Sequence, residues 1–167
     1  LDQPFARVGS HPRSEIVLDH PKVARRHLYL HATPHGVYCI DFEYRKAFGH
    51  RVDYWVSQTH GVQVGPYRLR IQTRPRPADQ VKRDRLWNTR IPTDWPKTPV
   101  LTFVHRGKLM GRYPIRRRLI SIGRHPLNNV RCKARTVSDF HAVLFWDVDK
   151  LWVIDLFSSG TTQLFNA

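Results

Sequence analysis

An arginine, a serine and a histidine stand at separate points of one basic stretch, residues 122–141, which reads IGRHPLNNVRCKARTVSDFH. The guanidinium of Arg124 presents a planar fork of N–H donors that matches phosphate oxygens and stays charged at any working pH. The hydroxyl of Ser138 adds a small neutral donor. These residue types suit contacts with an anion, although each alone is an ordinary solvated cation or a turn hydroxyl.

A repeat of the chain indicates which elements position these residues. Residues 8–42 align without a gap to residues 122–156, at an offset of 114. We therefore expect two copies of one fold. Eight of the 35 aligned positions are identical, namely Gly9/Gly123, His11/His125, Pro12/Pro126, Val23/Val137, His27/His141, Leu30/Leu144, Ile40/Ile154 and Asp41/Asp155.

Both copies consist of short β-branched and aromatic runs that are separated by turn residues. This pattern predicts an all-β fold of two antiparallel β-sandwiches. Evidence for helices is weak, because few windows hold a 3.6-residue apolar period free of Pro or Gly. The runs are EIVL, HLYLH, GVYCIDF, VDYWVS and GPYRLRI in the first copy, and VLTFV, LISIG, HAVLFW and LWVIDLF in the second.

The repeat predicts a first domain at residues 1–71, a linker at residues 72–98 and a second domain at residues 99–167. Proline and charge fill the linker, and its Trp87 and Trp95 suggest that parts of it dock on a domain. The first copy lacks the strands that open the second, and the second lacks those that close the first. Either the chain is a piece of a longer protein, or strands of one copy complete the sheet of the other. In the second case strands are exchanged, and the sequence does not determine the oligomeric state.

The second copy resembles the forkhead-associated (FHA) domain, a β-sandwich that binds phosphothreonine peptides through loops at one end. The family pattern is roughly G-R, then N-D-I-x-L, then V-S-x-x-H, then D-L-x-S-x-N-G-T. The repeat extends the resemblance to residues 5–71. The matching residues are Gly123 and Arg124; Asn128, Asn129, Val130 and Cys132; Val137, Ser138 and His141; and Asp155, Leu156, Phe157, Ser158, Ser159, Gly160 and Thr161.

The resemblance implies roles for four of these residues. Arg124 and Ser138 contact the phosphate. His141 braces the binding loops from behind, and it does not catalyse. Gly123 meets a tight backbone geometry, for which glycine is suited.

The last part of the motif departs from the family. In place of Asn-Gly-Thr the chain has Ser159, Gly160 and Thr161, and the segment is one residue short. Ser159 and Gly160 are expected to contact the peptide, and Thr161 to support the loop. A serine lacks the paired donor and acceptor of an amide, which affects affinity or peptide choice. An Asx-type turn explains Asp155.

The first copy lacks both phosphate donors. Its residue at the arginine position is Ser10, and its residue at the serine position is Ala24. Arg25 and Arg26 follow, and two interpretations of them are open: attraction of an anion, or a solvated charge pair, which we favour. The first copy is therefore predicted to have a structural or protein-contact role.

The net charge of +15, from 28 Lys and Arg against 13 Asp and Glu, predicts attraction to acidic or phosphorylated partners or to polyanions. The charge is spread along the chain. Its one dense cluster, Arg116 to Arg118, is expected to alternate between the two faces of a strand. This arrangement favours a solvated face or an acidic protein partner over nucleic acid.

Catalytic and metal-binding classes find no support in the motifs. The ten His residues form no HExxH set, and the chain has neither a nucleotide-binding glycine loop nor a GxSxG turn. No enzyme activity, cofactor or metal is predicted. Cys39 and Cys132 lack CxxC spacing and predict free thiols in an intracellular setting, cytoplasmic or nuclear. No apolar run approaches the ~20 residues of a membrane span, so no membrane association is predicted.

The predicted function is recognition of a threonine-phosphorylated protein by the second copy, with the first copy in support. Two alternatives stay open. One is a phosphate-independent FHA-like scaffold for protein assembly, which Ser10 and Ala24 favour for the first copy. The other is a basic polyanion-binding module, which rests on the net charge alone.

Overall fold

The computed structural model describes residues 3–33, 36–49, 53–72, 99–146, 151–160 and 162. The chain divides into two compact units, Leu1–Arg83 and Asp84–Ala167, here called unit 1 and unit 2. Strands dominate both units, and the predicted all-β class is confirmed. Most of the predicted linker, with Trp87 and Trp95, lies outside the described residues.

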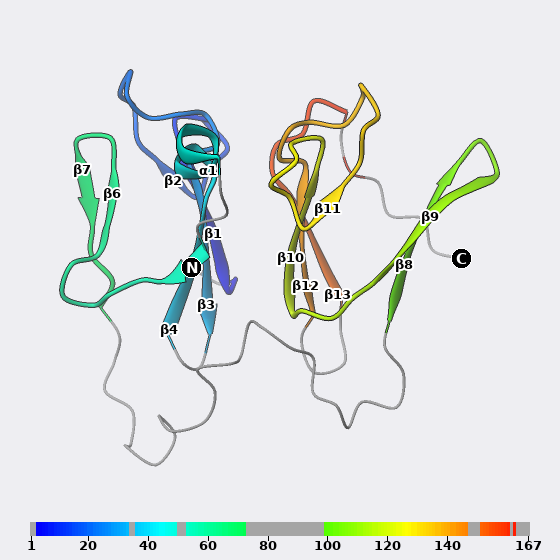
Figure 1. Ribbon diagram of the computed structural model, residues 1–167. Coiled ribbons are helices and arrows are strands. Elements are labelled where there is room, and N and C mark those ends of the chain that lie inside the picture. The colour runs from blue at the N-terminus through cyan, green and yellow to red at the C-terminus, as the bar shows by residue number, and fades with distance from the viewer. Residues whose placement is uncertain are drawn as a thin grey trace, which may run out of the picture. The chain divides into compact units, whose positions relative to one another are not determined.

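Unit 1 contains seven strands and one short helix among its described residues (Figure 1). They are β1 Phe5–Gly9, β2 Ile16–Val17, β3 Leu28–Thr33, β4 Gly36–Asp41, α1 Phe42–Phe48, β5 Asp53–Trp55, β6 Val62–Val64 and β7 Tyr67–Leu69. Five strands form one sheet in the order β2-β1-β3-β4-β5, and β6 and β7 form a separate hairpin. The β1–β2 pair is parallel and the other pairs are antiparallel.

Unit 2 contains six strands among its described residues. They are β8 Val100–His105, β9 Lys108–Pro114, β10 Leu119–Gly123, β11 Val130–Arg131, β12 Ala142–Trp146 and β13 Leu151–Asp155. The sheet has the order β11-β10-β12-β13, and β8 and β9 form a hairpin of their own. The short β10–β11 pair is parallel, as β1–β2 is in unit 1.

The two sheets repeat each other at the offset of 114 found in the sequence. Val8 pairs with Leu28 as Ile122 pairs with Ala142. The parallel pairs, the β1–β3 and β10–β12 pairs, and the β3–β4 and β12–β13 pairs all share this relation. The register of a strand sets the face to which each side chain points. The gapless repeat in the sequence is therefore also a repeat of the three-dimensional structure.

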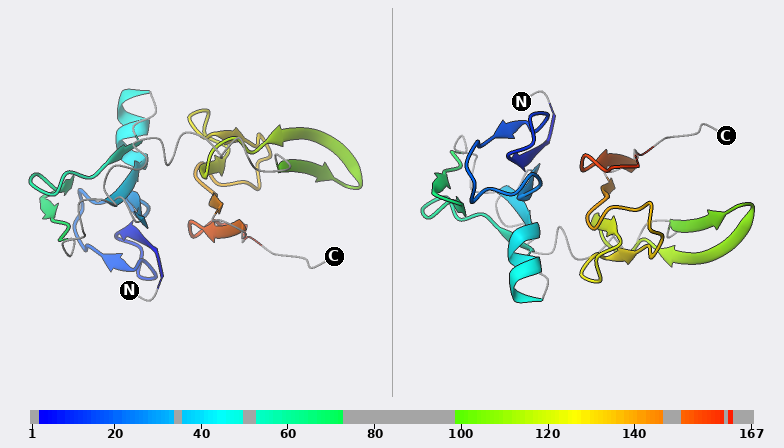
Figure 2. Two further views of the ribbon diagram at one scale, coloured as in Figure 1. Left: turned by 90° about the horizontal axis from the view of Figure 1, so that it is seen from below. Right: turned by 90° about the horizontal axis from the view of Figure 1, so that it is seen from above.

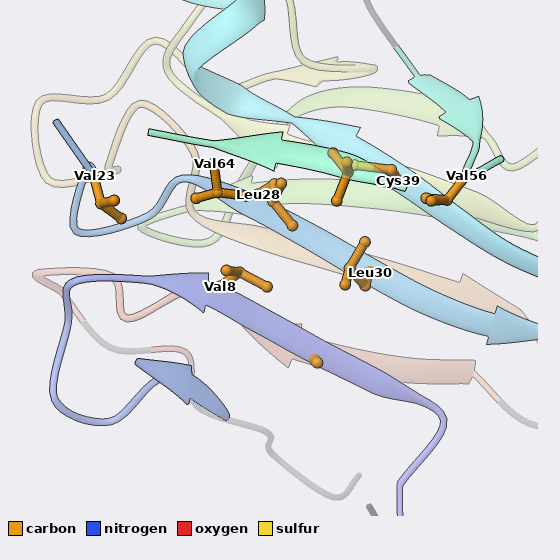
Figure 3. Packing of buried hydrophobic residues seen from close by; sticks show 9 residues of the cluster. Val8, Val23, Leu28, Leu30, Cys39, Val56 and Val64 are labelled. Carbon is orange, nitrogen blue, oxygen red and sulfur yellow. The ribbon is translucent and has the colours of Figure 1, made fainter. Parts of the chain in front are cut away.

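One face of the unit 1 sheet packs against the β6–β7 hairpin. Alternation along the strands directs apolar side chains to this face, and Figure 3 shows several of them in one layer. Gly65, in the turn of the hairpin, lies so close to the loop before β3 that a Cβ there would be 2.9 Å from Cγ2 of Val23. The buried members are Ala6, Val8, Val23, Leu28, Leu30, Cys39, Val56, Val62 and Val64.

The same face of the repeated sheet is covered by a different hairpin in unit 2. Ile120 and Leu144, the counterparts of Ala6 and Leu30, belong to a buried cluster with Ile115 and Val130. Leu101, Phe103 and Tyr113 of β8 and β9 pack against this cluster. Each unit thus combines the repeated sheet with its own hairpin, following the sheet in unit 1 and preceding it in unit 2. Figure 2 shows both hairpins beside their sheets from two further directions.

The short helix α1 occurs in a chain for which the sequence provides only weak evidence of helices. The GVYCIDF run ends as a strand at Asp41, whose Oδ1 accepts a hydrogen bond of 2.8 Å from the N–H of Tyr44 and caps the helix. Gly49 follows the last turn with a φ of 69°, the left-handed conformation that commonly ends a helix.

The arginine cluster is also placed differently from the prediction. Residues 116–118 lie in the loop between β9 and β10, and therefore do not alternate across a strand. Arg116 and Arg117 are exposed there, and Arg118 is half-buried. Ile115 beside them is buried in the core of unit 2.

Candidate functional site

The loop after β10 and the loop before β12 lie in direct contact at one end of unit 2 (Figure 1). The N–H of Arg124 donates to the carbonyl of Ser138 at 2.9 Å, and the N–H of His125 donates to the carbonyl of Asp139 at 3.1 Å. A Cβ on Gly123 would lie 2.2 Å from the Asp139 oxygen. Only glycine allows this approach, so the tight geometry predicted at Gly123 is present, and it brings Arg124 beside Ser138.

A third loop, which follows β13, closes on Ser138. The hydroxyl of Ser138 accepts a hydrogen bond of 3.1 Å from the N–H of Ser159, and the two hydroxyl oxygens are 3.2 Å apart. Gly160 lies against the same loop, since a Cβ there would be 2.9 Å from the Thr136 carbonyl. The structure thus brings together Arg124, Ser138, Ser159 and Gly160, whereas Thr161 lies outside the described residues.

The guanidinium of Arg124 lies along the edge of these loops. Its Nε donates to the carbonyl of Val137 at 3.2 Å, and its Nη2 forms an ion pair of 2.9 Å with Oδ1 of Asp139. The Arg124 side chain remains 49% exposed, and these two contacts use only part of its five N–H donors. An anion approaching from solvent therefore meets a held and accessible cation.

His141 supports the serine loop from within. Its Nδ1 accepts a hydrogen bond of 3.2 Å from the N–H of Ser138. In unit 1 the Nδ1 of His27 accepts the N–H of Ala24 at 3.1 Å, in the same relation. Burial, the largest influence on His27, lowers its pKa and favours the neutral ring that this contact requires.

Asp155 organises the third loop. Its carboxylate accepts the N–H and the hydroxyl of Ser158, at 2.9 and 2.5 Å, and the hydroxyl of Thr162 at 2.6 Å. The predicted Asx-type turn is present. Burial of Asp155 opposes ionisation, but these hydrogen bonds outweigh it and hold its pKa below the ordinary value. Phe157, which lies between Asp155 and Ser158 in the sequence, is buried and adopts a φ of 57°. The chain turns there toward Ser138.

The family model of the FHA domain matches residues 6–81 and 120–166 of the chain. The protein belongs to the FHA family. FHA domains are phosphopeptide-binding modules of protein–protein interaction and are not enzymes. No curated protein and no solved structure matches the chain.

A pair of side-chain hydrogen bonds between Asn129 and Ser121 of unit 2 is not predicted from the sequence. Oδ1 of Asn129 accepts both the N–H and the hydroxyl of Ser121, at 2.8 and 3.0 Å. In unit 1 the carboxylate of Glu15 accepts the N–H of Arg7 at 2.7 Å and also pairs with its guanidinium. Asn129 and Ser121 occupy the same positions in unit 2 as Glu15 and Arg7 in unit 1, although the residue types differ. Only comparison of the two copies therefore reveals this shared contact.

Asn128 is a second positioning residue of the FHA loops. Its side chain is buried, and its Nδ2 donates to the carbonyls of His125 and Asp139, at 3.0 and 2.6 Å. These bonds join the first and second loops beside the contact made by Gly123. Asn128 belongs to the sequence motif, but the motif does not predict this role.

Unit 1 has the same backbone contacts between its first two loops as unit 2, but it has neither the guanidinium of Arg124 nor the hydroxyl of Ser138 at those positions. The N–H of Ser10 donates to the carbonyl of Ala24 at 3.0 Å, as Arg124 does to Ser138. Ala24 has no hydroxyl. The Asp41–Tyr44 hydrogen bond is the counterpart of Asp155–Ser158, but in unit 1 the chain continues into α1. The helix therefore takes the place of the third loop.

Two further kinds of feature are absent from the described ranges. No group of three or more His, Cys, Asp and Glu side chains there is arranged to hold a metal ion. None of the helices found there has the length and apolar character needed to cross a membrane. Cys39 and Cys132 are free thiols.

Proposed function

We propose that unit 2 recognises a phosphothreonine segment of a partner protein with Arg124, Ser138 and Ser159. One observation carries this proposal: the first two loops are joined at Gly123, and the partly exposed guanidinium of Arg124 contacts Val137 and Asp139, the residues on either side of Ser138. Three loops converge there, as an interaction module of the FHA family requires.

The chemistry of the three side chains fits a phosphorylated residue. Phosphothreonine carries a charge of about −1.5 to −2 and three acceptor oxygens. Arg124 supplies charge-assisted hydrogen bonds through the N–H groups that its protein contacts leave available. The Ser138 hydroxyl donates to a phosphate oxygen by turning from Ser159, whose hydroxyl then faces the peptide main chain. His141 and Gly123 position these donors from behind.

In the proposed arrangement the chain has an FHA domain at residues 99–167, a linker at 72–98 and a degenerate FHA domain at 1–71. Ser10 and Ala24 leave the first domain without the phosphothreonine donors of the second. Its part in phosphothreonine recognition is accordingly structural.

The test is a calorimetric titration with a phosphothreonine peptide library, using the full chain and the unphosphorylated twin peptides. We expect binding of phosphorylated peptides alone. Arg124→Ala removes charge-assisted hydrogen bonds worth about 1.5–3 kcal/mol, which weakens binding about 10- to 100-fold. Ser138→Ala, which removes one neutral donor, has a smaller effect.

Arg112→Ala is the matched control, because Arg112 is an exposed arginine of β9 in the same unit. It should leave phosphopeptide affinity unchanged. Equal binding of phosphorylated and plain peptides, or full affinity in Arg124→Ala, would refute phosphothreonine recognition and favour a phosphate-independent scaffold.

A further inference from the structure

Three arginines gather at the loop end of unit 1. The N–H of His11 donates to the carbonyl of Arg25 at 3.3 Å, and the Nδ1 of His11 accepts the N–H of Arg13 at 3.1 Å. The first contact joins the loop after β1 to the loop before β3, and the second lies within the loop after β1. Together they place the backbones of Arg13 and Arg25 next to His11, with Arg26 next along the chain.

The electrostatics of His11 report this concentration of charge. Burial is the first influence that lowers the pKa of His11, and the charges of Arg25, Arg13 and Arg26 lower it further. Over residues 10–27 four cations, Arg13, Lys22, Arg25 and Arg26, face only two carboxylates. One of those two, Glu15, is engaged by Arg7. The loop end thus carries a positive potential.

Arg25 occupies an informative position. It is the counterpart of Asp139, as the matching contacts to His11 and His125 and to Gly9 and Gly123 establish. In unit 2 the side chain at this position reaches across to Nη2 of Arg124 at 2.9 Å.

A side chain at the Arg25 position therefore extends toward the space in front of the first loop. In unit 1 the residue at the Arg124 position is Ser10, whose side chain carries no charge. Arg25 is exposed, and in the described part of unit 1 it has no ion-pair partner. The loop end of unit 1 thus carries a guanidinium on its second loop, from Arg25, whereas unit 2 carries one on its first loop, from Arg124.

We propose that the loop end of unit 1 is a second anion site, where Arg25, flanked by Arg13 and Arg26, binds an acidic segment of a partner protein. The ligand presents clustered negative charge, either a phosphorylated side chain or a run of carboxylates. Ala24 offers no hydroxyl, and α1 replaces the loop that would hold a peptide main chain. The site consequently selects charge and does not require phosphothreonine.

This site is independent of phosphothreonine binding by unit 2, and the experiment separates them by using Arg124→Ala as the background. Three peptides of one scaffold are titrated at 0.15 M salt, where general attraction is screened: a phosphoserine peptide, a glutamate-rich peptide and a neutral peptide. His11 is followed by NMR. The two acidic peptides should bind, shift the ring resonances of His11 and raise its pKa, since an anion offsets the surrounding arginines.

Arg25→Ala in this background should weaken acidic-peptide binding about tenfold and abolish the His11 response. Arg70→Ala is the matched control. Arg70 is an exposed arginine of the same unit that follows β7, at the opposite end of the hairpin from the Gly65 turn, which contacts the loop before β3. It should change neither readout, and both variants should keep the parent's unfolding midpoint.

The outcomes divide cleanly. Binding of the phosphoserine peptide alone, or of both acidic peptides, supports the anion site and identifies the source of its charge. Binding of neither peptide, or binding that Arg25→Ala leaves intact, overturns it. Failure of unit 2 to bind phosphothreonine would affect neither result, because Arg124 is absent throughout.

Discussion

At the scale of single residues, the two copies differ in where they carry charge on a shared backbone. Unit 2 has Arg124 on its first loop and Asp139 on its second, whereas unit 1 has Ser10 and Arg25 at these positions. The backbone hydrogen bonds between the loops are the same in both. Two exchanges at facing positions thus replace a guanidinium that has a carboxylate partner with one that has no ion-pair partner among the described residues.

The ion pair between Arg124 and Asp139 leads to a prediction for phosphopeptide affinity. The Asp139 carboxylate competes for one N–H group of Arg124 and repels an incoming phosphate. Both side chains are about half exposed, so the interaction is worth about 0.2–1 kcal/mol. Asp139→Asn should therefore strengthen phosphothreonine-peptide binding by about 1.4- to 5-fold in calorimetry.

Asp19→Asn removes the same charge from unit 1 and serves as the control for net charge. It should leave this affinity unchanged. Weaker binding by Asp139→Asn would mean that the carboxylate chiefly orients Arg124, and would contradict the competition argued here.

At the scale of elements, the contact between the first and second loops depends on a glycine at the end of a strand. A Cβ on Gly123 would lie 2.2 Å from the Asp139 carbonyl, and one on Gly9 would lie 2.3 Å from the Arg25 carbonyl. Because backbone meets backbone, neither clash is relieved by a rotamer change. Gly123→Ala should lower the free energy of unfolding by about 1–3 kcal/mol, measured by denaturant titration, and weaken phosphopeptide binding.

Gly111→Ala in β9 is the control, because nothing lies within 4 Å of a Cβ there. Its effect on stability should stay within about 0.5 kcal/mol. If Gly123→Ala were as stable as Gly111→Ala, the close approach of the two loops would not be a requirement of the fold.

The strands of the repeated sheets are predictable because short β-branched and aromatic runs lie between turn residues. The helix α1 is not, because its seven residues are too few for a clear period and continue an apolar strand at Phe42. Its cap Asp41 has the same residue type as Asp155, whose identical N–H contact opens a turn. The residues after the aspartate, and their packing, decide between helix and loop.

The candidate site divides in the same way. Arg124, Ser138 and His141 are predicted from their spacing within a motif, because that spacing reflects loops on the frame that the two copies share. The contacts of Asp139 and Asn129 are not predictable, because they depend on the direction of side chains across two loops. A polar residue of either type has many equally plausible partners when only the sequence is known.

At the scale of the whole molecule, the net charge of +15 acts together with the two loop ends. Each carries an excess of cations: by the sequence, residues 10–27 hold four against two carboxylates, and residues 124–141 hold four against one. Charge of this kind attracts any polyanion at low salt, whereas a phosphopeptide site engages a single phosphate through a few fixed donors. Salt dependence therefore distinguishes recognition from general attraction.

We expect phosphothreonine-peptide affinity to fall by less than about tenfold between 50 and 200 mM salt, because few ions are displaced. Mixed-sequence nucleic acid, bound through many phosphates, should lose about 10³-fold or more over the same range. Competition titrations with a labelled phosphopeptide at both salt concentrations measure the two together. Nucleic acid that still displaced the peptide at 200 mM would indicate a polyanion-binding surface at the loop end, because general attraction alone does not survive that screening.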